Sequence, residues 1–306
     1  MKTILVPTDF SDCSKHAFES ACSVARKTRS KIILLHVVST PALNDNEVEI
    51  PYMMELLKTT KKKMKKLISE VDCEGIKVID RVEPGIISDT INSNAKKFNA
   101  DLIVMGSDGI KSENKPQGSS VQHVMRDAKV PVLAIKDGTD KYKISNIVFA
   151  TDFSEEANLV FPFIKSFADI FGAQIHLLKV LTFSDSASRE KAEIESKKFI
   201  KENKLENYPT QILHHIRSEV EGINRYLDMN DSDLVAIGTH GRHGIARLLR
   251  GSIAESVVNR STVPVLTINF RNGKNGQQLN SKEEKIFNPH AEVQSELPFA
   301  IQVPSI

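Results

Sequence analysis

Residues 3–11 read TILVPTDFS and residues 146–154 read NIVFATDFS, so the chain repeats its opening at an offset of 143. The same offset relates IILLHVV at 32–38 to IHLLKVL at 175–181. An internal repeat fixes the architecture before any other feature does. The chain therefore contains two copies of one structural unit.

The ends of the two copies also match, at slightly shorter offsets. DLIVMGSDG at 101–109 corresponds to DLVAIGTHG at 233–241, and VPVLAIK at 130–136 corresponds to VPVLTIN at 263–269. A chain of 306 residues fits two domains of about 150 residues each. Both copies thus run through a full domain, with insertions or deletions between the matched segments.

Composition marks the boundaries of the two copies. The stretch DGTDKY at 137–142 is charged and rich in turn-forming residues, which is typical of a linker. We therefore predict domains at 1–138 and 143–270. From residue 271 the chain is rich in Asn, Gln, Lys, Glu and Pro, which predicts a disordered polar tail over 271–306. Leu297–Val303 is the part of that tail best suited to docking.

In the first copy, apolar runs alternate with segments of helical periodicity. We expect strands at Thr3–Pro7, Lys31–Val38, Ile76–Val82, Asp101–Gly106 and Val132–Lys136. We expect helices at Ser11–Arg29, Pro51–Val71, Ile86–Phe98 and Ser119–Asp127. The second copy repeats this order. Alternating strands and helices with apolar strands predict an α/β fold with one doubly wound parallel sheet per copy.

The overall composition excludes several classes of protein. The formal net charge is +2, which does not favour nucleic acid or an anionic membrane as partner. No apolar run reaches the roughly 18 residues of a membrane helix, and the N-terminus does not read as a signal peptide. The chain has three cysteines, Cys13, Cys22 and Cys73, which is an odd number, and they are scattered along the sequence. This pattern predicts a cytoplasmic protein whose thiols are buried or have no function at the surface.

Two loops of the second copy carry residues suited to binding an anion. Ligands of open parallel sheets bind beyond the carboxyl ends of the strands, where the strand order reverses. Gly238 and Gly241 follow one such strand and allow the backbone to approach a ligand closely. Gly251 and Ser252 open the next helix, whose free amides and dipole favour phosphate. Asp152 ends another strand and offers oxygens to a base amine or a ribose hydroxyl.

These segments resemble the universal stress protein family. GTHGRHGIARLLRGS at 238–252 fits the G-2x-G-9x-G-[S/T] pattern of that family, and the TDFS turn and the closing VPVL strand match as well. The resemblance covers both copies and implies five parallel strands in the order 3-2-1-4-5. It also implies ATP binding, as in some family members, with contacts to the adenine from Asp152 and Val180. Ribose and phosphates would contact Gly238, Gly241, Gly251, Ser252 and Ile253.

The first copy departs from this pattern. Its loop reads GSDGIKSENKPQGSS at 106–120, with eight residues between its second and third glycines. Glu113 adds an acid to the loop and Pro116 stiffens it, so an anion would meet a less positive field there. A structural turn is the favoured interpretation. The residues of this second, weaker candidate site are Asp9, Val37, Gly106, Gly109, Gly118 and Ser119.

No metal or catalytic motif is present in the sequence. His240 and His243 have no third ligand at a suitable spacing, so we predict no metal site. The GxxxxGK[ST], SGGxDS and GxSxG loops are absent, and no general base stands beside the phosphate loop. We therefore expect a protein that is not an enzyme, with slow ATP hydrolysis or autophosphorylation at Ser252 left open.

The sequence predicts a cytoplasmic stress-response module that binds ATP, with or without Mg²⁺, in its second copy and regulates a protein partner that the sequence does not identify. A scaffold that binds no nucleotide is the alternative. We expect the copies to pack as an intramolecular pseudo-dimer through Val130–Lys136 and Val263–Asn269, because edge pairing there removes exposed strand edges. A homodimer of whole chains stays open.

Overall fold

The computed structural model describes residues 1–39, 49–107, 120–136, 143–183, 189–239 and 251–269. Within these ranges ten strands alternate with eight helices, except that β5 is followed directly by β6. The predicted linker at 137–142 and the predicted tail at 271–306 lie outside the described residues.

The elements of the first copy follow the apolar runs of its sequence. They are β1 (Thr3–Pro7), α1 (Asp12–Thr28), β2 (Lys31–Val38), α2 (Glu49–Glu70), β3 (Val78–Pro84), α3 (Ile87–Lys97), β4 (Leu102–Gly106), α4 (Ser120–Asp127) and β5 (Val132–Ile135). Every residue of β1 is buried, as expected for a strand covered by helices on both faces. Ser11 caps the N-terminus of α1, because its side chain accepts a hydrogen bond from the Ser14 amide.

The second copy repeats this order of elements. They are β6 (Asn146–Ala150), α5 (Ala157–Phe171), β7 (Gln174–Thr182), α6 (Arg189–Asn203), β8 (Thr210–Ile216), α7 (Glu219–Met229), β9 (Leu234–Thr239), α8 (Gly251–Arg260) and β10 (Val265–Asn269). Gly172 ends α5 in the left-handed conformation, at φ 67°, that a glycine adopts without strain.

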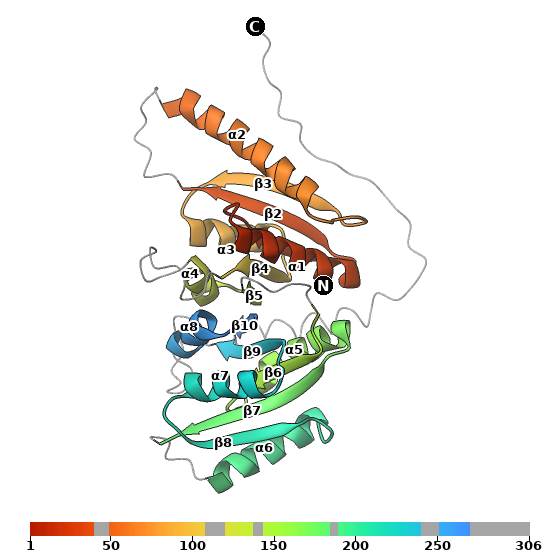
Figure 1. Ribbon diagram of the computed structural model, residues 1–306, viewed down its shortest axis with the longest axis vertical. Helices are drawn as coiled ribbons and strands as arrows, with labels where there is room; N and C mark the ends of the chain where they lie inside the picture. Colours follow the sequence, from red (N-terminus) through yellow and green to blue (C-terminus); the bar gives the residue numbers. More distant parts are fainter. Residues whose placement is uncertain (40–48, 108–119, 137–142, 184–188, 240–250, 270–306) are drawn as a thin grey trace.

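The two copies share one continuous sheet of ten strands (Figure 1). Its order is β3-β2-β1-β4-β5-β10-β9-β6-β7-β8, so each half has the expected 3-2-1-4-5 arrangement of parallel strands. The halves meet where β5 and β10 pair antiparallel, with Leu133 opposite Leu266. These are the strands on which we expected the copies to pair, and neither is left as an open edge.

Helices cover both faces of this sheet in two layers. Helices α1, α2, α5 and α6 pack on one face, and α3, α4, α7 and α8 pack on the other. Each layer encloses a hydrophobic core that includes residues of both copies, among them Leu133 and Leu266 on the first face. The copies are therefore joined by shared cores as well as by strand pairing.

Polar contacts also cross the junction between the copies. On one face, the Lys27 ammonium of α1 lies 5.4 Å from the ring centre of Phe171 in α5. On the other face, Arg126 of α4 donates to Glu255 of α8 over 2.8 Å, and this carboxylate raises the pKa of the Arg126 guanidinium. The buried Lys136 donates to the backbone carbonyl of Val258.

The ion pair between α4 and α8 is expected to contribute little to stability. The Arg126 and Glu255 side chains are 38% and 23% exposed, so water screens their attraction. A double-mutant cycle of Arg126→Met and Glu255→Gln, followed by urea unfolding, should give a coupling energy of about 0.5 kcal/mol. A coupling energy above about 2 kcal/mol would show that this pair, rather than the shared core, holds the junction.

Candidate functional site

The turn that follows β6 is fixed by two hydrogen bonds between side chains and the backbone. The Phe153 amide donates to Thr151 Oγ1 and the Ser154 amide donates to Asp152 Oδ1, each over 3.0 Å. These bonds stabilise Phe153 at φ 60°, a left-handed conformation that few bulky residues adopt. Asp152 is thereby held beyond the end of β6, and no described residue donates to its other oxygen, Oδ2.

A buried lysine of β7 supports this turn. Lys179 has a side chain only 7% exposed, and its Nζ donates to the Asp152 carbonyl over 2.8 Å. The same ammonium donates to Glu195 Oε2 of α6 over 2.7 Å and lies 5.8 Å from the Phe153 ring centre. A buried ammonium is tolerated only with partners of this kind. The position of Asp152 therefore depends on β7 and α6 as well as on its own turn.

A pocket opens beside Asp152 at the carboxyl ends of β6, β7 and β9. Its empty volume is about 450 Å³, with the solvent at its mouth included. The pocket lies where β6 separates β7 from β9, which is the point where the strand order of the second half reverses. This is the position at which open α/β sheets bind ligands. The lining residues are Ala150, Thr151, Asp152, Leu178, Lys179, Val180, Glu219, Ile223, Ile237 and Ile253.

The pocket wall formed by Val180 depends on a glycine in α7. A Cβ at Gly222 would lie 2.6 Å from Val180 Cγ1 and 3.2 Å from Ile216 Cγ2, closer than side chains tolerate. Glycine at this position lets α7 approach β7 and leaves the Val180 side chain facing the pocket. The helix accepts the cost of an internal glycine, roughly 1 kcal/mol, for this close packing.

The structure brings together three of the predicted nucleotide-binding residues. Asp152, Val180 and Ile253 line the same pocket, although they come from three separate elements. Gly238 lies in β9, paired with Ile268 of β10, and is not part of the lining. Helix α8, whose N-terminus was predicted to bind the phosphates, begins at Gly251 and includes Ser252. Gly241 lies outside the described residues.

Seven of the ten lining residues were not among the predicted site residues, and three of these seven are informative: Lys179, Glu219 and Ile223. Lys179 left a signal, because a lysine inside the apolar run LLKVL must be buried with partners. No feature of the sequence indicates Glu219 or Ile223, because both lie on α7 and reach the pocket only through the packing of that helix on β7.

The first copy builds the same turn around Asp9. The Phe10 amide donates to Thr8 Oγ1, the Ser11 amide donates to Asp9 Oδ1, and Phe10 has φ 66°. The position equivalent to Lys179 is occupied by His36. Its Nδ1 lies within hydrogen-bonding distance of the Thr8 carbonyl oxygen, at 2.7 Å, and its ring packs against Phe10. The turn is thus conserved between the copies, while its buried support differs.

One of the candidate residues of the first copy, Gly106, has a packing role. A Cβ at Gly106 would lie 2.7 Å from the Cys13 carbonyl oxygen, so this glycine allows α1 to pack closely on β4. Val37 is half-buried at the end of β2. Gly109, Gly118 and Ser119 lie outside the described residues, as do His240 and His243, for which we predicted no metal. The described residues contain no cluster of three metal-ligating side chains.

The fold and the pocket define a class of protein: a duplicated, doubly wound α/β chain with a pocket at the switch point of its second half. Residues 1–136 and 143–269 each match the universal stress protein family, and the chain belongs to that family. None of the described helices is both long and apolar enough to cross a membrane.

Relatives of both one-domain and two-domain length resemble the chain. Universal stress protein MJ0531 of Methanocaldococcus jannaschii is 32% identical over 142 residues, which cover 44% of this chain and 82% of that protein. Universal stress protein Slr1230 of Synechocystis is 24% identical over 87% of this chain and 99% of its own. The crystal structure of a universal stress protein from Archaeoglobus fulgidus covers 87% of this chain and 96% of its own, at 22% identity and a TM-score of 0.68. The last likeness concerns the fold alone.

Proposed function

We propose that the second copy binds ATP or a related adenine nucleotide and that the chain acts as a regulatory stress-response module. The observation that carries this proposal is the largely apolar pocket at the switch point of the second half, with the Asp152 carboxylate at its edge. Small-molecule pockets are mostly apolar with a few polar groups that orient the ligand. The flat adenine ring suits the walls made by Val180, Ile223 and Ile253.

The polar group of the pocket is suited to an adenosine. Asp152 Oδ1 is used by the Ser154 amide, whereas Oδ2 is available to accept a hydrogen bond from the adenine amine or a ribose hydroxyl. The start of α8 at Gly251 supports a phosphate site nearby, because amides at a helix N-terminus favour anions. Mg²⁺ would accompany the phosphates rather than occupy a protein site of its own.

The test is calorimetric titration of the full chain with ATP in the presence of Mg²⁺. Asp152→Asn keeps Oδ1 as acceptor for the Ser154 amide, so the turn survives, but it replaces the free carboxylate oxygen by an amide donor. The dissociation constant should rise by about 10-fold or more, because a hydrogen bond to a charged group is lost. Asp9→Asn is the matched control, since it replaces a carboxylate by an amide at the equivalent position of the first copy and should leave the dissociation constant unchanged.

Two outcomes would contradict the proposal. Absence of binding heat in the wild-type chain, together with no nucleotide released from the purified protein, would favour the scaffold that binds no nucleotide. Equal losses in Asp152→Asn and Asp9→Asn would place binding in both copies. We propose binding without efficient hydrolysis, so phosphate release during the titration should not exceed the uncatalysed background. We further propose the cytoplasm as its compartment, in keeping with three cysteines that are all free thiols.

A further inference from the structure

Two of the three cysteines lie against each other although 51 residues separate them in the chain. Cys22 is on α1, and Cys73 is in the loop that follows α2. Their sulfur atoms are 3.1 Å apart, and both residues are free thiols. Disulfides require cysteines whose side chains already point at each other, because distant pairs cannot close without backbone movement. This pair meets that requirement because the loop after α2 lies against α1.

The loop that carries Cys73 is fixed to α1 by polar contacts. The Arg26 guanidinium donates to the Asp72 carbonyl over 3.0 Å and to its carboxylate over 2.8 Å. The Ile76 amide closes a turn by donating to the Cys73 carbonyl over 3.0 Å. Lys15 of α1 pairs with Glu70 at the end of α2 over 3.3 Å. Cys73 is therefore held beside α1 by neighbours on both sides.

The two thiols differ in exposure and in acidity. Cys22 is 1% exposed, and its hydrogen bond to Cys73, together with burial, raises the pKa of the Cys22 thiol. The hydrogen bond from Cys22 lowers the pKa of the half-buried Cys73, with a smaller contribution from Arg26, against the opposing effects of burial and Asp72. The thiolate is the reactive form of cysteine. Because Cys22 is buried and Cys73 is partly exposed, an oxidant in solution reaches Cys73 first, and Cys22 lies behind it in position to attack.

We propose that Cys22 and Cys73 form a dithiol site that reacts with hydroperoxides and closes to a disulfide. The Cys73 thiol first loses its proton to solvent, and its thiolate attacks the terminal oxygen of the peroxide. The O–O bond breaks, and the leaving oxygen takes up one proton from solvent and departs as an alcohol or water. Cys73 is then a sulfenic acid. The Cys22 sulfur attacks the Cys73 sulfur, the S–O bond breaks, and the hydroxide leaves as water with the Cys22 proton. Two thiols are oxidised by two electrons, and the peroxide is reduced by two.

The disulfide would tie α1 to the loop after α2 in the first copy only. The second copy contains no cysteine, so it has no equivalent. Closing a loop of this length restricts the unfolded chain, which stabilises the fold. Oxidation should therefore raise the melting temperature of the chain by several degrees. The expected effect is a more rigid first half beside an unmodified candidate pocket in the second.

The test uses the reduced full-length chain treated with hydrogen peroxide. The number of titratable thiols in the denatured protein should fall from three to one, with the loss of two hydrogens in intact mass and one peptide pair linked between Cys22 and Cys73. Dithiothreitol should restore all three thiols. Cys13 provides an internal control, because it is 5% exposed and its Sγ points at the Ile135 carbonyl. Cys13→Ser should therefore still lose two thiols.

Two variants separate the roles of the pair. Cys73→Ser removes the nucleophile and should slow thiol loss at least about 10-fold. Cys22→Ala removes the attacking thiol, so a sulfenic acid should persist on Cys73 and be captured by a cyclic 1,3-diketone. Retention of three thiols in the wild type, oxidation of Cys73 to a sulfinic acid without a disulfide, or a disulfide between two chains would each overturn the proposal.

Discussion

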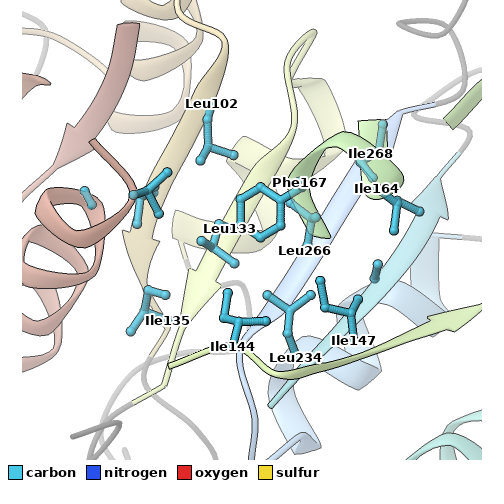
Figure 2. Packing of buried hydrophobic residues seen from close by; sticks show 14 of the residues in the cluster. Leu102, Leu133, Ile135, Ile144, Ile147, Ile164, Phe167, Leu234, Leu266 and Ile268 are labelled. Carbon is cyan, nitrogen blue, oxygen red and sulfur yellow. The ribbon is translucent and has the colours of Figure 1, made fainter. Parts of the chain in front are cut away.

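Phe167→Ala is expected to lower the free energy of unfolding by about 3–5 kcal/mol, the usual cost of removing a fully buried phenylalanine. Phe167 is 1% exposed and lies on α5 in the core that both copies share. Figure 2 shows its ring where β5 meets β10, close to Leu133 and Leu266, which face each other across that strand pair. The alanine would leave a cavity at the junction itself.

This position tests whether the two copies unfold together. Because Leu133 belongs to the first copy and Leu266 to the second, a cavity between them weakens both halves. Urea unfolding of the variant, followed by far-ultraviolet circular dichroism, should show a single transition at lower urea concentration. Two separated transitions, with only one of them shifted, would mean that the copies are independent units.

Phe183→Ala is the matched control for this measurement. It removes the same side chain, but Phe183 is 72% exposed at the end of β7. The change in free energy of unfolding should stay within about 0.5 kcal/mol. A loss equal to that of Phe167→Ala would show that the measured effect does not come from the junction core.

Central strands were the elements best predicted from the sequence. β1 and β2 have the predicted bounds, because a strand buried on both faces must be apolar throughout. The edge strand β3 was predicted at 76–82 and runs over Val78–Pro84. Its sequence VIDRVEP carries charged residues on an open edge, so hydrophobicity marks its ends poorly. The strand order itself came from family resemblance, since alternation of elements fixes a parallel sheet but not its order.

The candidate site was predictable only in part. Asp152 follows one buried strand and Val180 lies near the end of another. Because the carboxyl ends of parallel strands meet at one edge of the sheet, the sequence predicts that these two residues lie close together. Gly222 could not be chosen in the same way. Any larger residue at this position would place its Cβ 2.6 Å from Val180 Cγ1. That clash depends on how closely α7 packs against β7, which the sequence does not reveal. Likewise, nothing in the spacing of Cys22 and Cys73 predicts their contact.

Lys179→Met is the second change with a large expected effect. Methionine matches the length of the lysine chain but removes the ammonium that binds the Asp152 carbonyl and the Glu195 carboxylate. Breaking a buried ion pair costs about 3–5 kcal/mol. Glu195 is 34% exposed and regains water, so we expect a loss of about 2 kcal/mol in the free energy of unfolding.

The surface lysine of the same network provides the control. Lys191 also faces Glu195, at 3.9 Å, but its side chain is 66% exposed. Lys191→Met should change the free energy of unfolding by no more than about 0.5 kcal/mol. If both substitutions cost the same, the effect would arise from the charge of Glu195 and not from the buried support of the turn.

Lys179→Met also links the stability of the turn to ligand binding. The ammonium holds the Asp152 backbone, so its loss should loosen the turn that fixes the carboxylate at the pocket edge. We therefore expect ATP affinity, measured by calorimetry under conditions where the variant is folded, to fall about as far as in Asp152→Asn, roughly 10-fold. Combining the two substitutions should add little further loss, because both act through the position of one carboxylate. Additive losses would instead mean that Lys179 contributes to the affinity on its own.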